Sequence, residues 1–225
     1  YELSTRMEKE ARGIMGNVIE LRKKLETVKK ARQKAEQEKL ILQKKSEMDA
    51  LTGMANRYRL NDFSDEIFAQ ALQDETSLAV EILDVDYFKE FNDNYGHQRG
   101  DECLLTIANV IKKLTEEYDA FCARYGGDEF VIIIKGISHD EMIAFCSKLR
   151  ERVLECGLEH RYSKVMPMVT ISQGACWGIP QRGNRMWDYL HAADDMLYKV
   201  KNFSRNNYCI GDIMESDDIV MDLSQ

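Results

Sequence analysis

The stretch Arg124-Tyr-Gly-Gly-Asp-Glu-Phe130 stands between two short runs of β-forming residues, 120–123 and 131–134. Two such runs separated by paired glycines predict a β-hairpin. Gly126 and Gly127 are expected to supply the positive φ angles of a tight primed turn, because glycine adopts these angles without steric cost. The hairpin fixes two strands of a sheet, and the other elements are placed relative to it.

Two acids, Asp128 and Glu129, follow the glycines directly. The hairpin therefore places two carboxylates at its tip, beside two residues that have no side chains. This arrangement leaves open space against the backbone, which suits a bulky anion held through metal ions. An exposed turn with ordinary solvated acids is the alternative interpretation.

A second pair of acids follows the apolar run Leu78-Ala-Val-Glu-Ile-Leu83, which predicts a strand. The run ends in Asp84-Val85-Asp86, and residues two apart in a strand share a face. Two carboxylates on one face repel each other unless a cation or a proton lies between them. Mg²⁺ prefers a few carboxylate oxygens together with substrate phosphates, so the pair is a candidate metal site. Two strand-end acids in solvent are the alternative.

Residues 87–101 combine apolar and polar side chains that match a nucleotide. Phe88 and a second phenylalanine three residues later share one helical face and predict core packing. Lys89 suits a phosphate, or is a solvated surface lysine. Asn92 and Asp101 match a guanine edge, because an amide both accepts and donates and a carboxylate accepts from two N–H groups. His97 is expected in a loop bracketed by glycines, where a loop hydrogen bond is the alternative to a ligand contact.

Periodicity places the remaining elements. An amphipathic helix begins after Asn56, its expected N-cap, and the other expected elements are helices over 101–117, 139–154 and 187–201 and strands over 168–172 and 206–210. The β-α-β-β-α-β pattern within this order indicates an α+β, ferredoxin-like core with helices on one face of an antiparallel sheet. In such a sheet Asp84 and Asp128 meet at the centre, where two-metal phosphoryl chemistry requires ions about 3.5–4 Å apart.

Residues 1–48 predict a long helix that precedes the domain at 49–210. Apolar residues recur in heptads, which favours a parallel homodimeric coiled coil; a helix folded back on the domain is the alternative. The a positions weaken toward Arg32 and Lys39, and the d positions are Met7, Ile14, Leu21, Val28, Ala35 and Leu42. Residues 49–57 form the joint through which a change of coil packing would reach the domain. An acidic tail, 211–225, is expected to be loosely held.

Charge and composition narrow the classes of function that the chain is expected to have. Residues 1–48 hold 13 Lys/Arg and 8 Asp/Glu, whereas the remainder holds 18 and 31, so the globular part is acidic and is not expected to bind nucleic acid. No apolar run approaches the roughly 18 residues of a membrane span, and the chain begins at Tyr1, so a cytoplasmic piece of a longer protein is expected. The six cysteines form no C-x-x-C pair and are expected to be small core residues.

Five blocks in this order resemble the GGDEF diguanylate cyclases over about residues 46–210. The blocks are DALTGMANR at 49–57, DVDYFKEFNDNYGHQRGD at 84–101, RYGGDEF at 124–130, VTISQG at 169–174 and ADDMLYKVKNFSRN at 193–206. The resemblance implies that two GTP condense into cyclic di-GMP with release of two pyrophosphates. Each domain would hold one GTP, so two domains must face each other, and the coil would set their orientation.

The resemblance also implies roles for single residues. Asp84, the Val85 carbonyl, Asp128 and Glu129 would bind two Mg²⁺ ions, with Mn²⁺ as a substitute. Asp128, Glu129 and Lys89 would act in catalysis, where an acid of the hairpin helps to deprotonate the 3′-hydroxyl. The nucleotide would be held by Phe88, Asn92, His97, Asp101, Gly126, Gly127, Lys201 and Arg205. An upstream sensor or receiver domain is expected, and a membrane-anchored sensor is the alternative to a wholly cytoplasmic protein.

The chain departs from the family pattern at three places. Many members carry an inhibitory R-x-x-D product site before the hairpin, whereas residues 116–123 here contain no arginine. Ser204 stands where glycine is usual, and Gln173 where an apolar residue is usual. A catalytically silent module that binds GTP and relays a signal is the main alternative function, and a purely structural dimerisation module is a further one.

Overall fold

The structure is a computed structural model that describes residues 22, 24–30, 32–34, 47–213 and 219–221. The chain divides into two compact units, Tyr1–Ser46 and Glu47–Gln225. The described residues of the first unit are helical, and Leu25 and Val28 of the heptad stripe are 56% and 63% exposed. Arg32 is also described, and the other predicted heptad positions lie outside the described residues.

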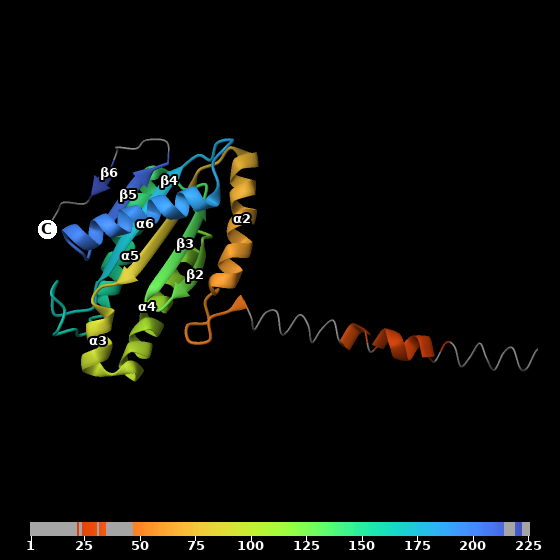
Figure 1. The fold of residues 1–225 in the computed structure, drawn as a ribbon, viewed down its shortest axis with the longest axis horizontal. Coiled ribbons are helices and arrows are strands. Elements are labelled where there is room, and N and C mark those ends of the chain that lie inside the picture. The colour runs from red at the N-terminus through yellow and green to blue at the C-terminus, as the bar shows by residue number, and fades with distance from the viewer. Residues whose placement is uncertain (1–21, 23, 31, 35–46, 214–218, 222–225) are drawn as a thin grey trace, which may run out of the picture. The chain divides into compact units, whose positions relative to one another are not determined.

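The described part of the second unit forms one six-stranded sheet in the order β2-β3-β1-β4-β5-β6 (Figure 1). The neighbours pair antiparallel except β4 and β5, which are parallel because α6 crosses over between them. The first four strands give the ferredoxin-like order β2-β3-β1-β4, as the sequence predicted. The strands are β1 (Leu78–Val85), β2 (Phe121–Gly126), β3 (Glu129–Lys135), β4 (Ile171–Gly178), β5 (Tyr208–Asp212) and β6 (Ile219–Met221).

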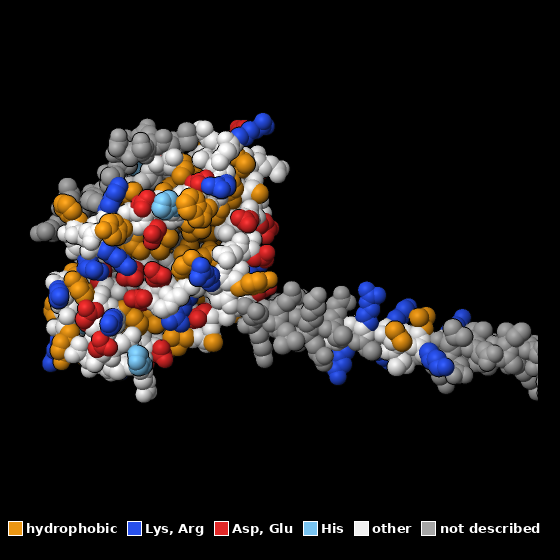
Figure 2. All heavy atoms as spheres, in the orientation of Figure 1, with side chains coloured by type: hydrophobic (Ala, Val, Ile, Leu, Met, Phe, Trp, Pro, Cys, Tyr) orange, Lys and Arg blue, Asp and Glu red, His pale blue; other side chains and the backbone are white. Residues whose placement is uncertain are grey.

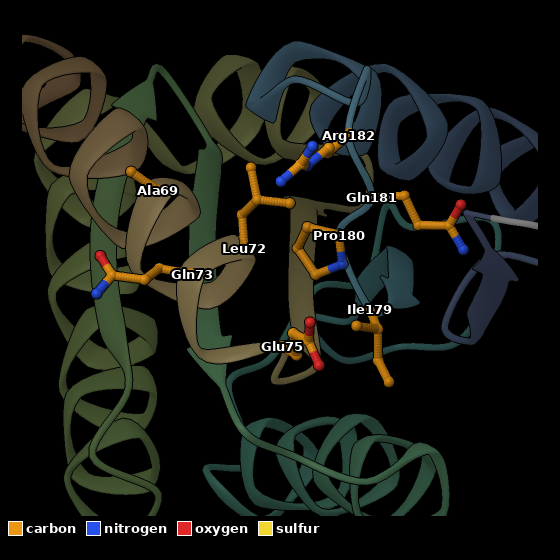
Figure 3. Close-up of a pocket in the computed structure, with 8 residues that line it drawn as sticks. All are labelled: Ala69, Leu72, Gln73, Glu75, Ile179, Pro180, Gln181 and Arg182. Atoms are coloured by element: carbon orange, nitrogen blue, oxygen red, sulfur yellow. The ribbon is translucent and has the colours of Figure 1, made fainter.

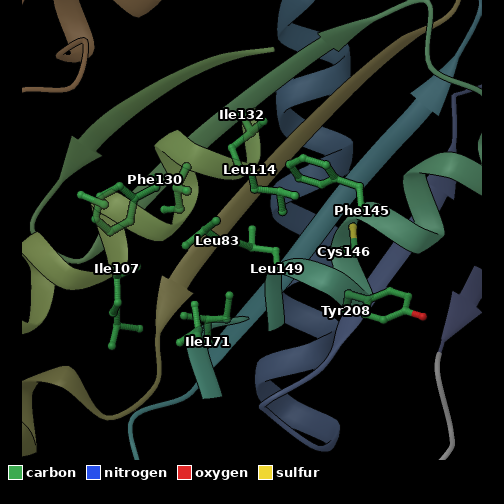
Figure 4. Close-up of a cluster of buried hydrophobic side chains, with 14 of the residues drawn as sticks. Leu83, Ile107, Leu114, Phe130, Ile132, Phe145, Cys146, Leu149, Ile171 and Tyr208 are labelled. Atoms are coloured by element: carbon green, nitrogen blue, oxygen red, sulfur yellow. The ribbon is translucent and has the colours of Figure 1, made fainter. Parts of the chain in front are cut away.

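Helices cover both faces of the sheet (Figure 1). The helices are α2 (Arg57–Asp74), α3 (Phe88–Tyr95), α4 (His97–Glu117), α5 (His139–Glu155) and α6 (Met186–Phe203). The larger core packs α3, α4 and α5 against one face, through side chains such as Leu83, Ile107, Phe130 and Phe145 (Figure 4). A second cluster joins α2 and α6 to the other face. The helices within the β-α-β-β-α-β pattern therefore lie on one face, as predicted, and α2 and α6, which lie outside that pattern, cover the other.

Helix α6 packs unusually close to β4, and Gly174 is the reason. A Cβ atom at this glycine would lie 2.0 Å from the backbone N of Leu197 and 2.3 Å from the carbonyl O of Ala193. The helix backbone therefore touches the strand backbone, a separation that only a residue without a side chain permits. This contact fixes α6, and the residues at its C-terminal end, relative to the centre of the sheet.

Several predicted boundaries differ from the structure. Strand β4 begins at Ile171 and continues to Gly178, whereas the sequence predicted 168–172. The run from Gln173 to Gly178 contains two glycines and mixed polarity, and it is a strand because it pairs with both β1 and β5. Strand β5 runs from Tyr208 through Asp212, into the segment assigned to a loose tail, and β6 pairs with it.

The interior holds four of the six cysteines, as expected, whereas Cys122 is half-buried and Cys156 is exposed. The prediction that all are core residues is wrong for Cys156, which is the C-cap of α5. The core also contains Glu81, at the centre of β1 and fully buried. The Cys146 thiol donates to it at 3.8 Å, and burial raises the pKa of Glu81 to about 8.

None of the helices among the described residues is both long enough and apolar enough to cross a membrane.

Candidate active site

The C-terminal end of β1 and the tip of the β2–β3 hairpin meet in the sheet, as the sequence predicted. Asp84 lies directly opposite Glu129 on β3, and the Val85 amide donates to the Asp128 carbonyl at 3.3 Å. The Asp84 and Glu129 side chains therefore share the face that α6 covers. Figure 2 shows acidic side chains with Lys and Arg around them over the end of the sheet where β1 terminates.

The negative charges of the two central acids, Asp84 and Asp128, repel each other. Burial and the negative charge of Asp128 raise the pKa of Asp84, a hydrogen bond from Lys201 opposes both effects, and the net result is a pKa of about 6. Burial also raises the pKa of Asp128, against the charges of Lys201 and Arg124. Lys201 Nζ lies 2.8 Å from Asp84 Oδ2. One ammonium thus partly neutralises two partly buried carboxylates that repel each other, an arrangement that favours an additional cation.

The donor set fits a hard divalent cation. The described residues hold no ready-made cluster of three or more His, Cys, Asp or Glu side chains. Two carboxylates near each other, a third at Glu129 and a backbone carbonyl match the preference of Mg²⁺ for a few protein oxygens completed by water and phosphate. A cation that took Asp84 would release Lys201 for an anionic group.

The hairpin tip has open space beside its backbone. A Cβ atom at Gly126 or Gly127 would meet nothing within 4 Å, so a bulky group can approach, as predicted. Only Gly127 has a positive φ, 54°, and the two-residue connection consists of Gly127 and Asp128. The prediction that both glycines supply positive φ angles is wrong for Gly126, which ends β2 beyond a register shift at Arg124.

Arg124 links the hairpin to the joint at residues 49–57. Its Nε and Nη2 donate to the Gly127 carbonyl at 3.0 and 2.7 Å, and its Nη1 lies 3.0 Å from Asp49 Oδ1. Burial alone would raise the pKa of Asp49, but hydrogen bonds from Thr52 and Arg124 outweigh burial and lower it. Asn56 caps α2 through the amides of residues 58 and 59, as predicted. Sequence analysis assigned no role to Arg124, although it is the first residue of the stretch 124–130.

The residues predicted to hold guanine lie on α3 and α4. The Asn92 side chain packs against Gly100, and its buried Oδ1 has no hydrogen-bond partner among the described residues. Asp101 and His97 are exposed one turn apart on α4. The prediction of a loop at His97 is wrong, because α4 begins there, four residues before the predicted start. Phe88 is 8% exposed and belongs to the core, as its helical spacing predicted.

The basic residues lie on two sides of the acids. Lys89 is exposed in the first turn of α3, which has no side-chain cap at its N-terminus, so unpaired amides there suit an anion. Lys201 and Arg205 come from the end of α6 and from the turn that follows it. The left-handed residues of this turn are Arg205 and Asn206, whereas Ser204 has a φ of −136°. Serine therefore causes no strain where the family usually has glycine.

Asp86 lies just beyond β1 and differs from Asp84 in its surroundings. The Thr170 and Ser172 hydroxyls donate to it at 2.7 Å, and Arg205 Nη1 donates at 3.3 Å. These donors occupy Asp86, so of the two acids predicted to share a metal site Asp84 remains the candidate ligand.

Figure 3 shows a hollow of about 710 Å³ between the end of α2 and the segment after β4. It lies beside Glu75 and Ile179, next to the start of β1, so it is at the opposite end of the sheet from Asp84. Its volume is typical of a ligand pocket, but its lining brings no group of acids together. The candidate active site is therefore the one at the β1 terminus.

Comparison with known proteins agrees with this geometry. Residues 46–207 match the family model described as "Diguanylate cyclase, GGDEF domain". The bifunctional diguanylate cyclase/cyclic di-GMP phosphodiesterase MucR of Pseudomonas aeruginosa is 32% identical over 161 residues, 72% of this chain. Diguanylate cyclase DosC of Escherichia coli is 34% identical over 164 residues, 71% of this chain. The chain spans 23% and 34% of the lengths of these two relatives.

Two solved structures share the fold. The coiled coil and GGDEF domain of DgcB from Caulobacter crescentus, solved with c-di-GMP, superposes with a TM-score of 0.72 at 27% identity and covers 85% of this chain and 99% of that one. Diguanylate cyclase SiaD from Pseudomonas aeruginosa, solved with its activator SiaC, has a TM-score of 0.66 at 27% identity, with 93% and 76% covered. The family model covers most of the chain. The chain therefore belongs to the GGDEF family of diguanylate cyclases.

Proposed function

We propose that the chain condenses two GTP into cyclic di-GMP and releases two pyrophosphates. The observation that carries this proposal is the juxtaposition of Asp84 and Asp128, which repel each other, beside Lys201 and an open hairpin backbone. A silent GTP-binding module would need neither two acids whose charges repel each other nor a third acid opposite Asp84.

Three groups of side chains divide the work. Asp84, the Val85 carbonyl, Asp128 and Glu129 would hold Mg²⁺ or Mn²⁺, which supplies charge neutralisation to the phosphates when bound. Lys89, Lys201 and Arg205 face the phosphates, and the open backbone at Gly126 and Gly127 lets them approach. Asn92, His97 and Asp101 hold the base and ribose, and the unpartnered Oδ1 of Asn92 is a ready acceptor for a guanine N–H.

The reaction proceeds in two identical steps, each of which forms one bond and breaks one bond. The 3′-oxygen of one GTP forms a bond to the α-phosphorus of the other, the bond from that phosphorus to the β-bridging oxygen breaks, and pyrophosphate leaves. The proton of the 3′-hydroxyl passes to a hairpin carboxylate, for which Glu129 is the candidate, and then to water. The second step repeats this with the roles of the nucleotides exchanged and closes the ring.

One domain offers one set of these residues, so the reaction needs a second copy that faces the first. The heptad stripe of residues 1–48 provides the means of pairing, and the Asp49–Arg124–Gly127 contacts connect the end of that segment to the hairpin. Coil packing would thus control the orientation of the two halves.

Assay with GTP and Mg²⁺ tests the function. Purified protein is expected to form cyclic di-GMP and pyrophosphate in a molar ratio of one to two, detected by chromatography. A protein that binds GTP in calorimetry and forms no product under any condition of dimerisation would instead be the silent signalling module.

Fusion of residues 47–225 to a designed parallel dimeric coil tests control by the stalk. Insertion of one to seven residues at the junction rotates the domains in steps of about 100°, so cyclic di-GMP formation is expected to vary periodically with the insertion. Equal activity at every insertion length would contradict control by the coil.

Gly100→Ala is expected to raise KM for GTP about tenfold, because a Cβ there would lie 1.9 Å from Asn92 Oδ1 and displace that side chain. Alanine favours a helix by about 1 kcal/mol over glycine, so thermal stability should not fall in parallel. Gln98→Ala, an exposed position on the same helix, is the control. An unchanged KM would exclude Asn92 from nucleotide binding.

Cyclic di-GMP is expected not to inhibit through the stretch before the hairpin. Glu117 there accepts from Lys148 at 2.7 Å and from Arg152 at 2.8 Å, and these ion pairs link α4 to α5. Glu117 is negatively charged, whereas the inhibitory site of the family carries a positively charged arginine. Initial rates measured with added product should fall only by competition with GTP. A calorimetric isotherm with a second product site that Glu117→Ala removes would contradict this expectation.

A further inference from the structure

Asp86 is a buried carboxylate beside Arg205, which follows the end of α6. Its side chain is fully buried, and four groups donate to its oxygens: Thr170 Oγ1 and Ser172 Oγ at 2.7 Å, the Asn206 amide at 3.0 Å and Arg205 Nη1 at 3.3 Å. Two donors come from the segment that leads into β4 and from β4 itself, and two come from the turn after α6. Asp86 therefore ties the end of β1 to that turn.

The turn that Asp86 holds is a strained one. Arg205 and Asn206 both adopt left-handed conformations, with φ of 51° and 46°. Asparagine tolerates this region, but arginine adopts it only when the surroundings determine the backbone. The Arg205 amide donates to Val200 at 2.9 Å, and the Asn206 amide donates to Asp86. The buried carboxylate is thus one of the contacts that determine where the Arg205 side chain begins.

Tyr87 holds the other end of the same side chain. The centre of its ring lies 4.6 Å from Arg205 Cζ, a cation–π contact. Tyr87 itself has a φ of 55°, and its carbonyl accepts from the Phe91 amide at 3.0 Å and lies 3.1 Å from His160 Nε2. A carbonyl only accepts, so His160 carries its proton on Nε2. The fully buried histidine therefore fixes the backbone beneath the guanidinium.

We propose that Asp86 and Tyr87 are positioning residues, which hold the Arg205 guanidinium so that its remaining donors meet an anionic group of the nucleotide. Among the described residues, Asp86 alone accepts from this guanidinium, through Nη1, and the side chain is 28% exposed. A guanidinium fixed at one edge and over one face presents its other N–H groups in a rigid fork that matches phosphate oxygens.

The two ion pairs at this end of the site then have different tasks. Lys201 pairs with Asp84, a proposed metal ligand, and would exchange partners when a cation binds. Arg205 pairs with Asp86, which is buried, and would keep that partner throughout. The inference rests on the proposed function, since it assigns Arg205 to GTP. It gives Asp86 a role other than the metal ligation that the sequence suggested, and it gives Tyr87 a role that neither the motifs nor the comparisons supply.

Kinetics of Asp86→Asn and Tyr87→Leu test the inference. Asparagine keeps the shape and loses the charge that holds the guanidinium, and leucine removes the ring but leaves Asp86 in place. Each variant is expected to raise KM for GTP about tenfold, the size of one lost charge-assisted contact, with kcat changed less than KM. Asp93→Asn, an exposed acid on α3, is the matched control.

A double-mutant cycle separates positioning from a general structural role. In an Arg205→Ala background, Asp86→Asn and Tyr87→Leu should change KM less than about twofold, because interacting residues are not additive. Losses that multiply in the double variants, or KM values equal to wild type in the single variants, would overturn the inference. If Asp86→Asn does not fold, as judged by thermal unfolding, the Tyr87→Leu cycle decides alone.

The outcome is separable from that of the proposed function. A wild-type protein that forms no cyclic di-GMP refutes the function, and the same cycle is then measured with dissociation constants for GTP in the presence of Mg²⁺. A wild-type protein that is active while both cycles are additive refutes only the positioning role.

Discussion

Asp128→Asn is expected to lower the rate of cyclic di-GMP formation by about a hundred- to a thousandfold, the size of effect seen when one preorganised group that stabilises the transition state is removed from an active site. The substitution keeps the shape of the hairpin tip and removes one of the two acids that repel each other there. Asp128 is only half-buried, so the thermal unfolding temperature should stay close to that of the wild type.

Two further measurements make this result specific. Mn²⁺ binding in the presence of GTP, followed by electron paramagnetic resonance, should weaken in the variant. Asp119→Asn is the control, because Asp119 is exposed, precedes β2 and has a φ of 49°, which asparagine adopts readily. An Asp128→Asn protein that retained wild-type turnover and Mn²⁺ affinity would remove the hairpin acid from the proposed chemistry.

Glu81→Gln is expected to flatten the pH dependence of stability. Burial raises the pKa of Glu81 from 4.5 to about 8, so the folded protein takes up a proton on this group that the unfolded chain gives up above its ordinary pKa. The stability contributed by the neutral acid is fully present below about pH 4.5 and is lost as the pH rises through 8. At 1.36 kcal/mol per pKa unit, the loss amounts to at most about 5 kcal/mol.

Denaturant unfolding at pH 5, 7 and 9 measures the difference. Wild type and Glu81→Gln should agree most closely at pH 5, and the variant should be the more stable protein at pH 9. Glu66→Gln, on the exposed surface of α2, serves as the control and should follow the wild type at each pH. Parallel curves for wild type and Glu81→Gln would show that Glu81 is not neutral in the folded protein.

Local pattern was sufficient for much of the fold. The glycine pair between two β-forming runs predicted the hairpin, and apolar periodicity located α5 and most of α6. The acids of the hairpin and of β1 could be brought together because a ferredoxin-like sheet leaves only one place for two central strand ends. The resemblance of five sequence blocks then supplied roles that spacing alone left open.

Contacts between distant segments could not be predicted from the chain alone. The start of α4 at His97 was missed because Gly100 weakens the helical pattern, although it is there to make room for Asn92. The extension of β4 was missed because Gln173-Gly174 does not alternate like a strand; its two neighbours impose that conformation. The position of the Arg205 guanidinium depends on Asp86, which is 119 residues away in the sequence.

The backbone contact at Gly174 bears on how activity can be graded. A helix that touches a strand without intervening side chains loses the contact on a slide of a fraction of an ångström, since no flexible atoms take up the displacement. A shift of α6 against β4 would therefore move Lys201 and Arg205 together relative to Asp84. If the chain acts as proposed, α6 and β4 keep one arrangement during turnover, and intermediate output reflects the fraction of time that two intact domains face each other.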